Sequence, residues 1–397
     1  MPRPRTLALV LALAATLAAC TGGGSGKDKA SPSGPPLVLG FINMQGAPAG
    51  SFPEAAVGAR AAVAHVNDDL GGVGGRPLRL TSCTTDGTPE SSQGCAQQVL
   101  AAKPVAVMSG IDLGANASVS LITRAGVPYV TGSPTLGAEL TTAGAYAFTG
   151  GTAADLLGIG DYLIERKHVR SIHVLHEDLP GLLNSAISAA GDIFRAKHVS
   201  DVKLVAEKAD AADFAPAVTA AAAGNPDAIV VVFPAQACAR IMQAAQALGV
   251  RSELYYPGAC ATPGVVRAAP GGLGRSFFGS GYLPVGDSGG GADADAFRAR
   301  VPKGQRSPLS EATFSTILNL AALMGDGAVD PAALRARLAA THDQPNVLAH
   351  PYTCDGLQLP LLNTVCNSNI RLLQYRDGAF TDVLGEWVTG AKLNELV

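Results

Sequence analysis

Short apolar segments alternate with segments of helical periodicity along most of this 397-residue chain, and this alternation is the strongest constraint on its fold. Residues 37–42 have the composition of a buried strand. A helix is expected from Pro53, because proline is tolerated in a first turn, and Gly71 and Gly72 end it. Such alternation predicts an α/β fold with parallel sheets that are covered by helices on both faces.

The alternation forms two blocks, the second of which begins after residue 150. Strands are expected at residues 37–42, 77–82, 105–109, 127–131, 171–175, 202–206, 228–233, 370–375 and 380–384. Further helices are expected at residues 90–102, 113–125, 153–167, 182–196, 214–223, 237–248, 294–301, 309–324 and 330–340. Ligands of open α/β sheets bind beyond the carboxyl ends of the strands, so we expect a cleft between the two blocks, lined by the loops there.

The N-terminus has the features of an export signal. Arg3 and Arg5 precede an apolar segment that is too short to span a bilayer, and Ala18 and Ala19 lie directly before Cys20. This pattern resembles a bacterial lipobox, which predicts a signal peptide at residues 1–19 and a lipid on Cys20. The alternative is an ordinary secretory signal with a chance cysteine. Residues 20–36 are rich in Gly, Ser, Pro and Lys and predict a flexible linker. The expected location is the extracytoplasmic face of the cell membrane.

Cysteine occurs seven times in the chain, and an even number remains if Cys20 carries lipid. Outside the cytoplasm this favours three disulfides, although six cysteines allow fifteen pairings. We favour pairing of nearest neighbours, namely Cys83–Cys95, Cys238–Cys260 and Cys354–Cys366. No metal site is expected, because the chain has no CxxC motif and its histidines are scattered. A net charge of −3 without a basic block argues against a nucleic-acid partner.

Four segments carry a family resemblance. The first joins a helix to a strand through Asn67, a Gly-Gly pair and a Gly-Arg-Pro turn. The second runs from Gly126 to Thr135 and is followed by Glu139. The other two lie at residues 178–182 and 225–230. In this order they resemble the type I periplasmic binding proteins of the leucine/isoleucine/valine class, and the resemblance covers about residues 37–385.

The resemblance implies two Rossmann-like lobes that are joined by three crossovers and close on a small ligand. Lobe 1 would comprise residues 37–150 and 285–350, and lobe 2 residues 151–284 and 351–397. The protein would be a monomer without a cofactor, and its lipid-anchored form would deliver the ligand to an ABC permease in the membrane. The same fold also serves sensors that signal without transport, and the chain itself does not separate these two functions.

By the same resemblance, hydroxyl and backbone N–H groups of lobe 1 hold the carboxylate of an amino-acid ligand. Ser133 and Thr135 match hydroxyl-bearing positions, and Thr131 is a neighbouring candidate. The alternative for these hydroxyls is to cap the short helix that follows. Near the family's other hydroxyl position this chain has Leu113. Asp112 or Asn116 would compensate for it, or would instead cap the local helix.

The second lobe departs further from the family. Pro180 stands where an aromatic residue is usual, and Phe233 is followed by proline rather than an aromatic residue. Ala259 falls near the acid that pairs with the ligand ammonium, and a buried ammonium without a counter-charge costs several kcal/mol. The ligand is therefore an amide, a urea-like molecule or an apolar carboxylate, or else Glu177 or Asp178 supplies the charge. Phe233 is a candidate for the pocket wall or for ordinary core packing.

Enzyme activity is not expected. The chain has no Gly-x-Ser-x-Gly, no His-Glu-x-x-His and no dinucleotide-binding glycine motif after a strand. The sequence therefore predicts a binding protein.

Overall fold

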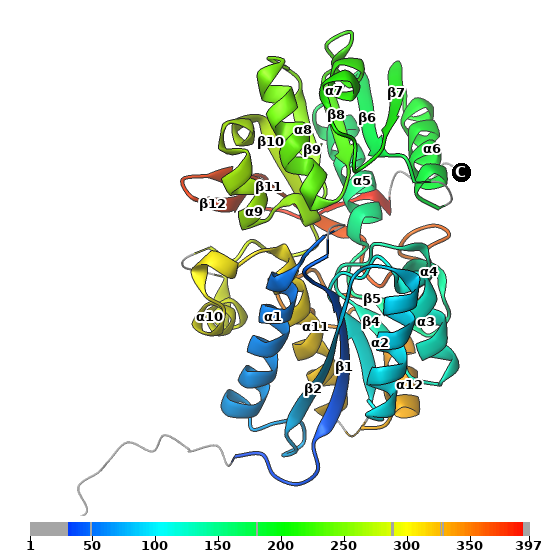
Figure 1. Cartoon of the computed structure of the whole chain (residues 1–397), viewed down its shortest axis with the longest axis vertical. Helices are drawn as coiled ribbons and strands as arrows, with labels where there is room; N and C mark the ends of the chain where they lie inside the picture. Colours follow the sequence, from blue (N-terminus) through cyan, green and yellow to red (C-terminus); the bar gives the residue numbers. More distant parts are fainter. Residues whose placement is uncertain are drawn as a thin grey trace, which may run out of the picture.

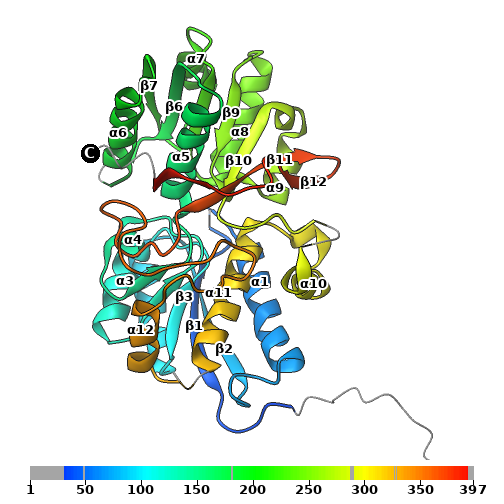
Figure 2. The same ribbon diagram turned by 180° about the vertical axis from the view of Figure 1, so that it is seen from behind.

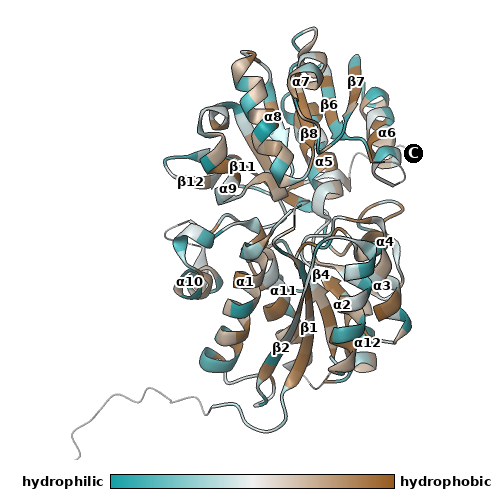
Figure 3. Cartoon of the chain, in the orientation of Figure 1, coloured by the Kyte–Doolittle hydropathy of each residue, from teal (hydrophilic) through white to brown (hydrophobic). Residues whose placement is uncertain are grey.

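The structure is a computed structural model that describes residues 31–47, 50–179, 182–286, 290–325, 327 and 329–391. The predicted signal peptide, Cys20 and Pro180 lie outside the described residues. The chain forms two α/β lobes, one above the other in Figure 1, each built around its own sheet. This confirms the predicted fold class. Figure 3 shows that hydrophobic residues concentrate on the strands of both sheets, as expected for strands covered on both faces.

The sheet of lobe 1 has five parallel strands in the order β2-β1-β3-β4-β5. Its strands are β1 (Leu37–Met44), β2 (Leu78–Thr85), β3 (Ala106–Ser109), β4 (Tyr129–Thr131) and β5 (Ala145–Ala147). The associated helices are α1 (Pro53–Ala64), η1 (His65–Asp69), α2 (Pro89–Ala101), α3 (Ala115–Arg124) and α4 (Gly137–Thr141). Two helices from later in the chain, α11 (Pro308–Gly325) and α12 (Pro331–Ala339), complete this lobe, and α11 packs along α1.

The second sheet runs in the order β12-β11-β10-β9-β8-β6-β7, and β13 pairs with β11. Its strands are β6 (Ser171–Glu177), β7 (Asp201–Glu207), β8 (Ala228–Val232), β9 (Glu253–Tyr256), β10 (Ser276–Ser280), β11 (Asn369–Arg376), β12 (Ala379–Asp382) and β13 (Val388–Thr389). The strands from β6 to β10 are parallel, whereas β11 and β12 form the antiparallel hairpin that Asp377-Gly378 predicted.

The helices associated with this sheet are α5 (Gly151–Asp161), η2 (Tyr162–Arg166), α6 (Leu182–Ala196), α7 (Ala215–Ala222), α8 (Ala235–Ala247), η3 (Gly258–Cys260), α9 (Pro263–Ala268) and η4 (Pro270–Arg275). The next two helices along the chain are α10 (Gly291–Arg300), which packs against α1 of lobe 1 (Figure 1), and η5 (Lys303–Gln305). The sequence analysis did not predict β5, β9, β10 or β13. Each is only two to five residues long, and such short segments carry too little periodicity to be recognised alone.

The chain passes between the two sheets three times, and the crossings contact one another. The hydroxyls of Thr149 and Tyr282, from the first two crossings, donate to the same carbonyl, that of Gly132, at 2.8 and 2.9 Å. The ring of Tyr352, from the segment that precedes the third crossing, lies 4.6 Å from that of Phe148. These shared contacts hold the hinge region as one packed unit from which the lobes extend.

Three disulfides join the predicted neighbours. Cys83–Cys95 connects β2 to α2, Cys238–Cys260 connects α8 to η3, and Cys354–Cys366 closes a loop before β11. The predicted pairing is therefore confirmed. Over the described ranges, no helix combines the length and the apolar character that crossing a membrane requires.

Candidate functional site

The loop after β4 is organised by Glu139, a buried acid on α4. Its Oε2 accepts hydrogen bonds from the backbone N–H groups of Thr135 and Leu136 at 2.8 and 3.0 Å. Its Oε1 accepts from the hydroxyls of Ser109 and Tyr129 at 3.2 and 2.7 Å. Burial raises the pKa of this carboxyl despite the backbone N–H donors. Glu139 thus fixes the loop in which the predicted ligand hydroxyls lie.

The three predicted hydroxyl-bearing residues differ in exposure. Thr131 is fully buried, and its Oγ1 accepts from the backbone N–H of Ser133 at 3.2 Å. Ser133 is half-buried, whereas Thr135 is exposed and its hydroxyl donates to the carbonyl of Ser133 at 3.3 Å. Ser133 lines a narrow crevice with Ser109 and residues of α11, and this crevice is too tight to hold a water molecule. Ser133 and Thr135 therefore lie in the loop after β4, with Ser133 at a crevice against α11 and Thr135 exposed.

The other lobe 1 candidates take part in contacts inside the lobe. Asp112 is buried, and its carboxylate accepts from the hydroxyl of Thr85 at 3.2 Å, from the N–H of Gly114 at 3.0 Å and from the hydroxyl of Ser92. Burial raises the pKa of Asp112. The amide oxygen of Asn116 accepts from the N–H of a residue in α4 at 3.0 Å. These two side chains connect loops of lobe 1.

The last of the lobe 1 candidates, Leu113, is half-buried.

In lobe 2, Glu177 is half-buried at the end of β6, and burial together with the nearby charge of Asp210 raises its pKa. Asp178 is exposed and accepts from the side-chain amide of Asn184 at 3.0 Å. The side chain of Phe233 is buried in the hydrophobic core.

Phe233 packs edge-on against Phe214 with ring centroids 5.6 Å apart. Ala259 lies half-buried in η3, a turn that the Cys238–Cys260 disulfide ties to α8. The N–H of the preceding residue, Gly258, donates to Oδ2 of Asp155 at 2.9 Å.

Asp155 is an acid of the hinge region that the sequence analysis missed. It lies on α5 and is buried, and burial raises its pKa to about 7. Its partner, Gly258, lies 103 residues away in the sequence, so no local sequence pattern predicts the contact. The side chain stabilises the turn that contains Ala259.

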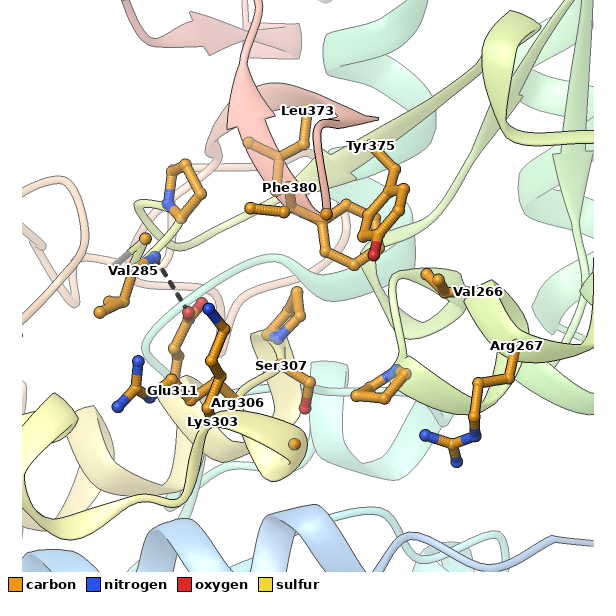
Figure 4. Close-up of a pocket in the computed structure, with 17 residues that line it drawn as sticks. Val266, Arg267, Val285, Lys303, Arg306, Ser307, Glu311, Leu373, Tyr375 and Phe380 are labelled. Atoms are coloured by element: carbon orange, nitrogen blue, oxygen red, sulfur yellow. Dashed lines mark hydrogen bonds between the residues drawn. The ribbon is translucent and has the colours of Figure 1, made fainter. Parts of the chain in front are cut away.

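A cavity of about 300 Å³ lies between the lobes, and elements on both of its sides line it. Leu373, Tyr375 and Phe380 of the β11–β12 hairpin face Lys303, Arg306 and Glu311 across it (Figure 4). The remaining lining residues are Pro263, Val266, Arg267, Pro284, Val285, Gly286, Gly304, Ser307, Pro308, Gly378 and Ala379. Among the predicted ligand-binding residues that the structure describes, none lines this cavity.

Glu311 is the acid of this cavity. It lies in the first turn of α11 and is 4% exposed. Its Oε1 accepts from the backbone N–H of Val285 at 3.2 Å, and its Oε2 has no hydrogen-bond partner within the described ranges. Burial raises the pKa of Glu311 to about 8, so the neutral acid predominates at pH 7. The described residues contain no cluster of three or more side chains suited to a metal ion.

Solved structures show the same fold. The branched-chain amino acid transporter substrate binding protein LivJ from Streptococcus pneumoniae, in complex with isoleucine, is 18% identical, with a TM-score of 0.72 over 89% of this chain and 99% of that one. A fatty acid ABC transporter substrate-binding protein from Thermomonospora curvata is 14% identical, with a TM-score of 0.74 over 90% and 93%. An ABC transporter solute binding protein from R. palustris, in complex with 4-hydroxybenzoate, is 17% identical, with a TM-score of 0.73 over 91% and 100%.

Among curated proteins, none matches this sequence. A family model described as periplasmic binding protein matches residues 38–355, which is most of the chain. This family consists of binding proteins rather than enzymes, in agreement with the prediction from sequence. The match and the two-lobed fold together show that the chain belongs to the periplasmic binding protein family.

Proposed function

We propose that this protein is the lipid-anchored solute-binding protein of an ABC importer at the extracytoplasmic face of the membrane. The observation that carries the proposal is the interlobe cavity, which residues of the lobe 1 helix α11 and of the lobe 2 hairpin line together. A ligand that contacts both lobes binds the closed form better than the open form, and hence favours closure. The proposed lobes are residues 37–150 with 285–350, and 151–284 with 351–397.

The proposed ligand is small and either amino-acid-like or amide-like. Two of the similar structures are complexes with isoleucine and 4-hydroxybenzoate, and a third is named as the binding protein of a fatty acid transporter, so this fold accommodates several ligand classes. Ser133 and Thr135 would supply hydroxyl groups from lobe 1, since their backbone N–H groups donate to Thr131 and Glu139 within the loop. Ala259 provides no charge for a ligand ammonium. This departure supports an amide-like ligand over a standard α-amino acid.

A thermal-shift screen tests the proposal. We expect at least one compound among amino acids, amides, urea and small carboxylates to raise the melting temperature of the purified protein. A ligand at 100 times its dissociation constant adds about 2.7 kcal/mol to the free energy of unfolding, which corresponds to a few degrees for a protein of this size. Absence of any shift across all four classes would contradict the proposed ligand type.

The lipid anchor has its own test. In bacterial cells that express the full chain, we expect palmitate to label the protein and Cys20→Ala to abolish both labelling and membrane association. The reason is that Cys20 is the residue at which the proposed lipid is attached. Thr21→Ala is the matched control and should remain labelled and membrane-bound. Membrane association that survives Cys20→Ala would show that the lipobox interpretation is wrong.

A further inference from the structure

We propose that the interlobe cavity is a ligand subsite in which Glu311 pairs with a carboxamide group, while the apolar body of the ligand lies against Leu373, Tyr375 and Phe380. This inference rests on the proposed solute-binding function and specifies the ligand class within it. It assigns the polar recognition to an acid on α11, away from the Ala259 turn.

The hydrogen bonding of Glu311 is the first argument. One carboxyl oxygen accepts the N–H of Val285, whereas the other is buried without a partner within the described ranges. Leaving a buried polar group unsatisfied costs about 1–3 kcal/mol, so a ligand that supplies the missing partner removes that cost on binding. Glu311 is one of the residues that line the cavity (Figure 4), so a ligand in the cavity is the candidate for this partner.

The charges around the cavity are the second argument. Arg267 lines it together with Glu311. Its guanidinium disfavours a ligand ammonium. A ligand carboxylate would lie against Glu311 and repel it whenever that acid ionises. A carboxamide is neutral, and its carbonyl and N–H groups together can pair with both oxygens of a neutral carboxylic acid.

The apolar wall is the third argument. The rings of Tyr375 and Phe380 lie 5.2 Å apart at 69°, and Phe380 also packs edge-on against buried Phe278 at 5.3 Å. These contacts hold the wall in one arrangement. A volume of about 300 Å³ falls at the lower end of small-molecule sites, which suits a ligand with a single ring or a branched alkyl group.

The test uses three probes with the same carbon skeleton: 3-phenylpropanamide, 3-phenylpropanoate and 3-phenylpropylamine. Their affinities are measured by calorimetry on the whole purified protein and on two variants. Glu311→Leu keeps the side-chain size and removes both oxygens. Glu311→Gln keeps an acceptor for Val285 and a donor for the amide carbonyl. Circular dichroism and the melting temperature without ligand establish that each variant is folded.

We expect the wild-type protein to bind the amide best, Glu311→Leu to weaken that binding by about 10- to 100-fold, and Glu311→Gln to keep it within a few-fold. Tightest binding of the amine, lost in both variants, would overturn the proposal in favour of an ion pair. Amide binding unchanged in Glu311→Leu would overturn the subsite and leave the solute-binding function intact. If no probe binds although the thermal-shift screen finds another ligand, only the subsite is wrong; if the screen also finds none, both proposals fail.

Discussion

Replacing Gly58 with alanine is expected to lower the free energy of unfolding by about 3 kcal/mol, because it pushes α1 away from α11. A Cβ atom at Gly58 would lie 2.1 Å from the backbone oxygen of Ser310 and 2.5 Å from Oγ1 of Thr313. The first of these atoms belongs to a helix backbone and cannot rotate away. The separation of the helices must therefore increase, which weakens the 2.7 Å hydrogen bond from Thr313 to the carbonyl of Ala55.

Gly94→Ala is the matched control. Gly94 lies inside α2, and nothing lies within 4 Å of the position that its Cβ would take. Alanine at such a site stabilises a helix by about 0.5–1 kcal/mol relative to glycine. Urea unfolding of both variants should thus give changes of opposite sign. If both variants change the free energy of unfolding by the same amount, α1 and α11 are packed less closely at Gly58 than the structure indicates.

The same substitution tests how α11 is positioned for binding. Ser310 directly precedes Glu311, so a displacement of α11 at Ser310 moves the acid of the cavity as well. Gly58→Ala should therefore weaken ligand binding even at temperatures where the variant is folded, whereas Gly94→Ala should not. The packing of lobe 1 and the interlobe cavity are thereby connected through one helix.

The order of strands and helices could be predicted because parallel strands are buried on both faces and produce continuous apolar segments, such as residues 37–42 and 228–233. The disulfides could be predicted because short loops favoured nearest neighbours. The short strands β5, β9, β10 and β13 could not be predicted, because pairing with neighbouring strands, rather than local sequence pattern, makes them strands.

The candidate site was less predictable for a physical reason. Asp155 and Glu311 are single acids within helical segments, and exposed helix surfaces contain many such residues. Their importance comes from burial and from partners distant in sequence: Gly258 for Asp155 and Val285 for Glu311. Asp112, which the sequence suggested for the ligand or for a helix, instead accepts hydrogen bonds from three segments of lobe 1. Only the tertiary structure distinguishes these environments.

Replacing Glu139 with alanine is expected to lower the free energy of unfolding by about 3–5 kcal/mol, because it removes the shared acceptor of four buried or half-buried donors. The donors are the hydroxyls of Ser109 and Tyr129 and the backbone N–H groups of Thr135 and Leu136. The phenol of Tyr129 would be left buried without its partner, since that residue is fully buried. Glu90→Ala, at an exposed acid in the first turn of α2, is the control and should change stability by less than about 0.5 kcal/mol.

Glu139→Gln is the conservative variant that tests the same network. Its amide oxygen can take the place of Oε2 and accept from the N–H groups of Thr135 and Leu136, and its NH₂ group can donate to the hydroxyl oxygens of Ser109 and Tyr129, which accept as well as donate. We therefore expect a smaller loss of stability than in Glu139→Ala. Hydrogen exchange at the Thr135 and Leu136 amides should stay slow in Glu139→Gln and become fast in Glu139→Ala. If Glu139→Ala protects those amides as well as the wild-type protein does, Glu139 does not hold the loop, and the Ser133–Thr135 conformation must depend on Thr131 instead.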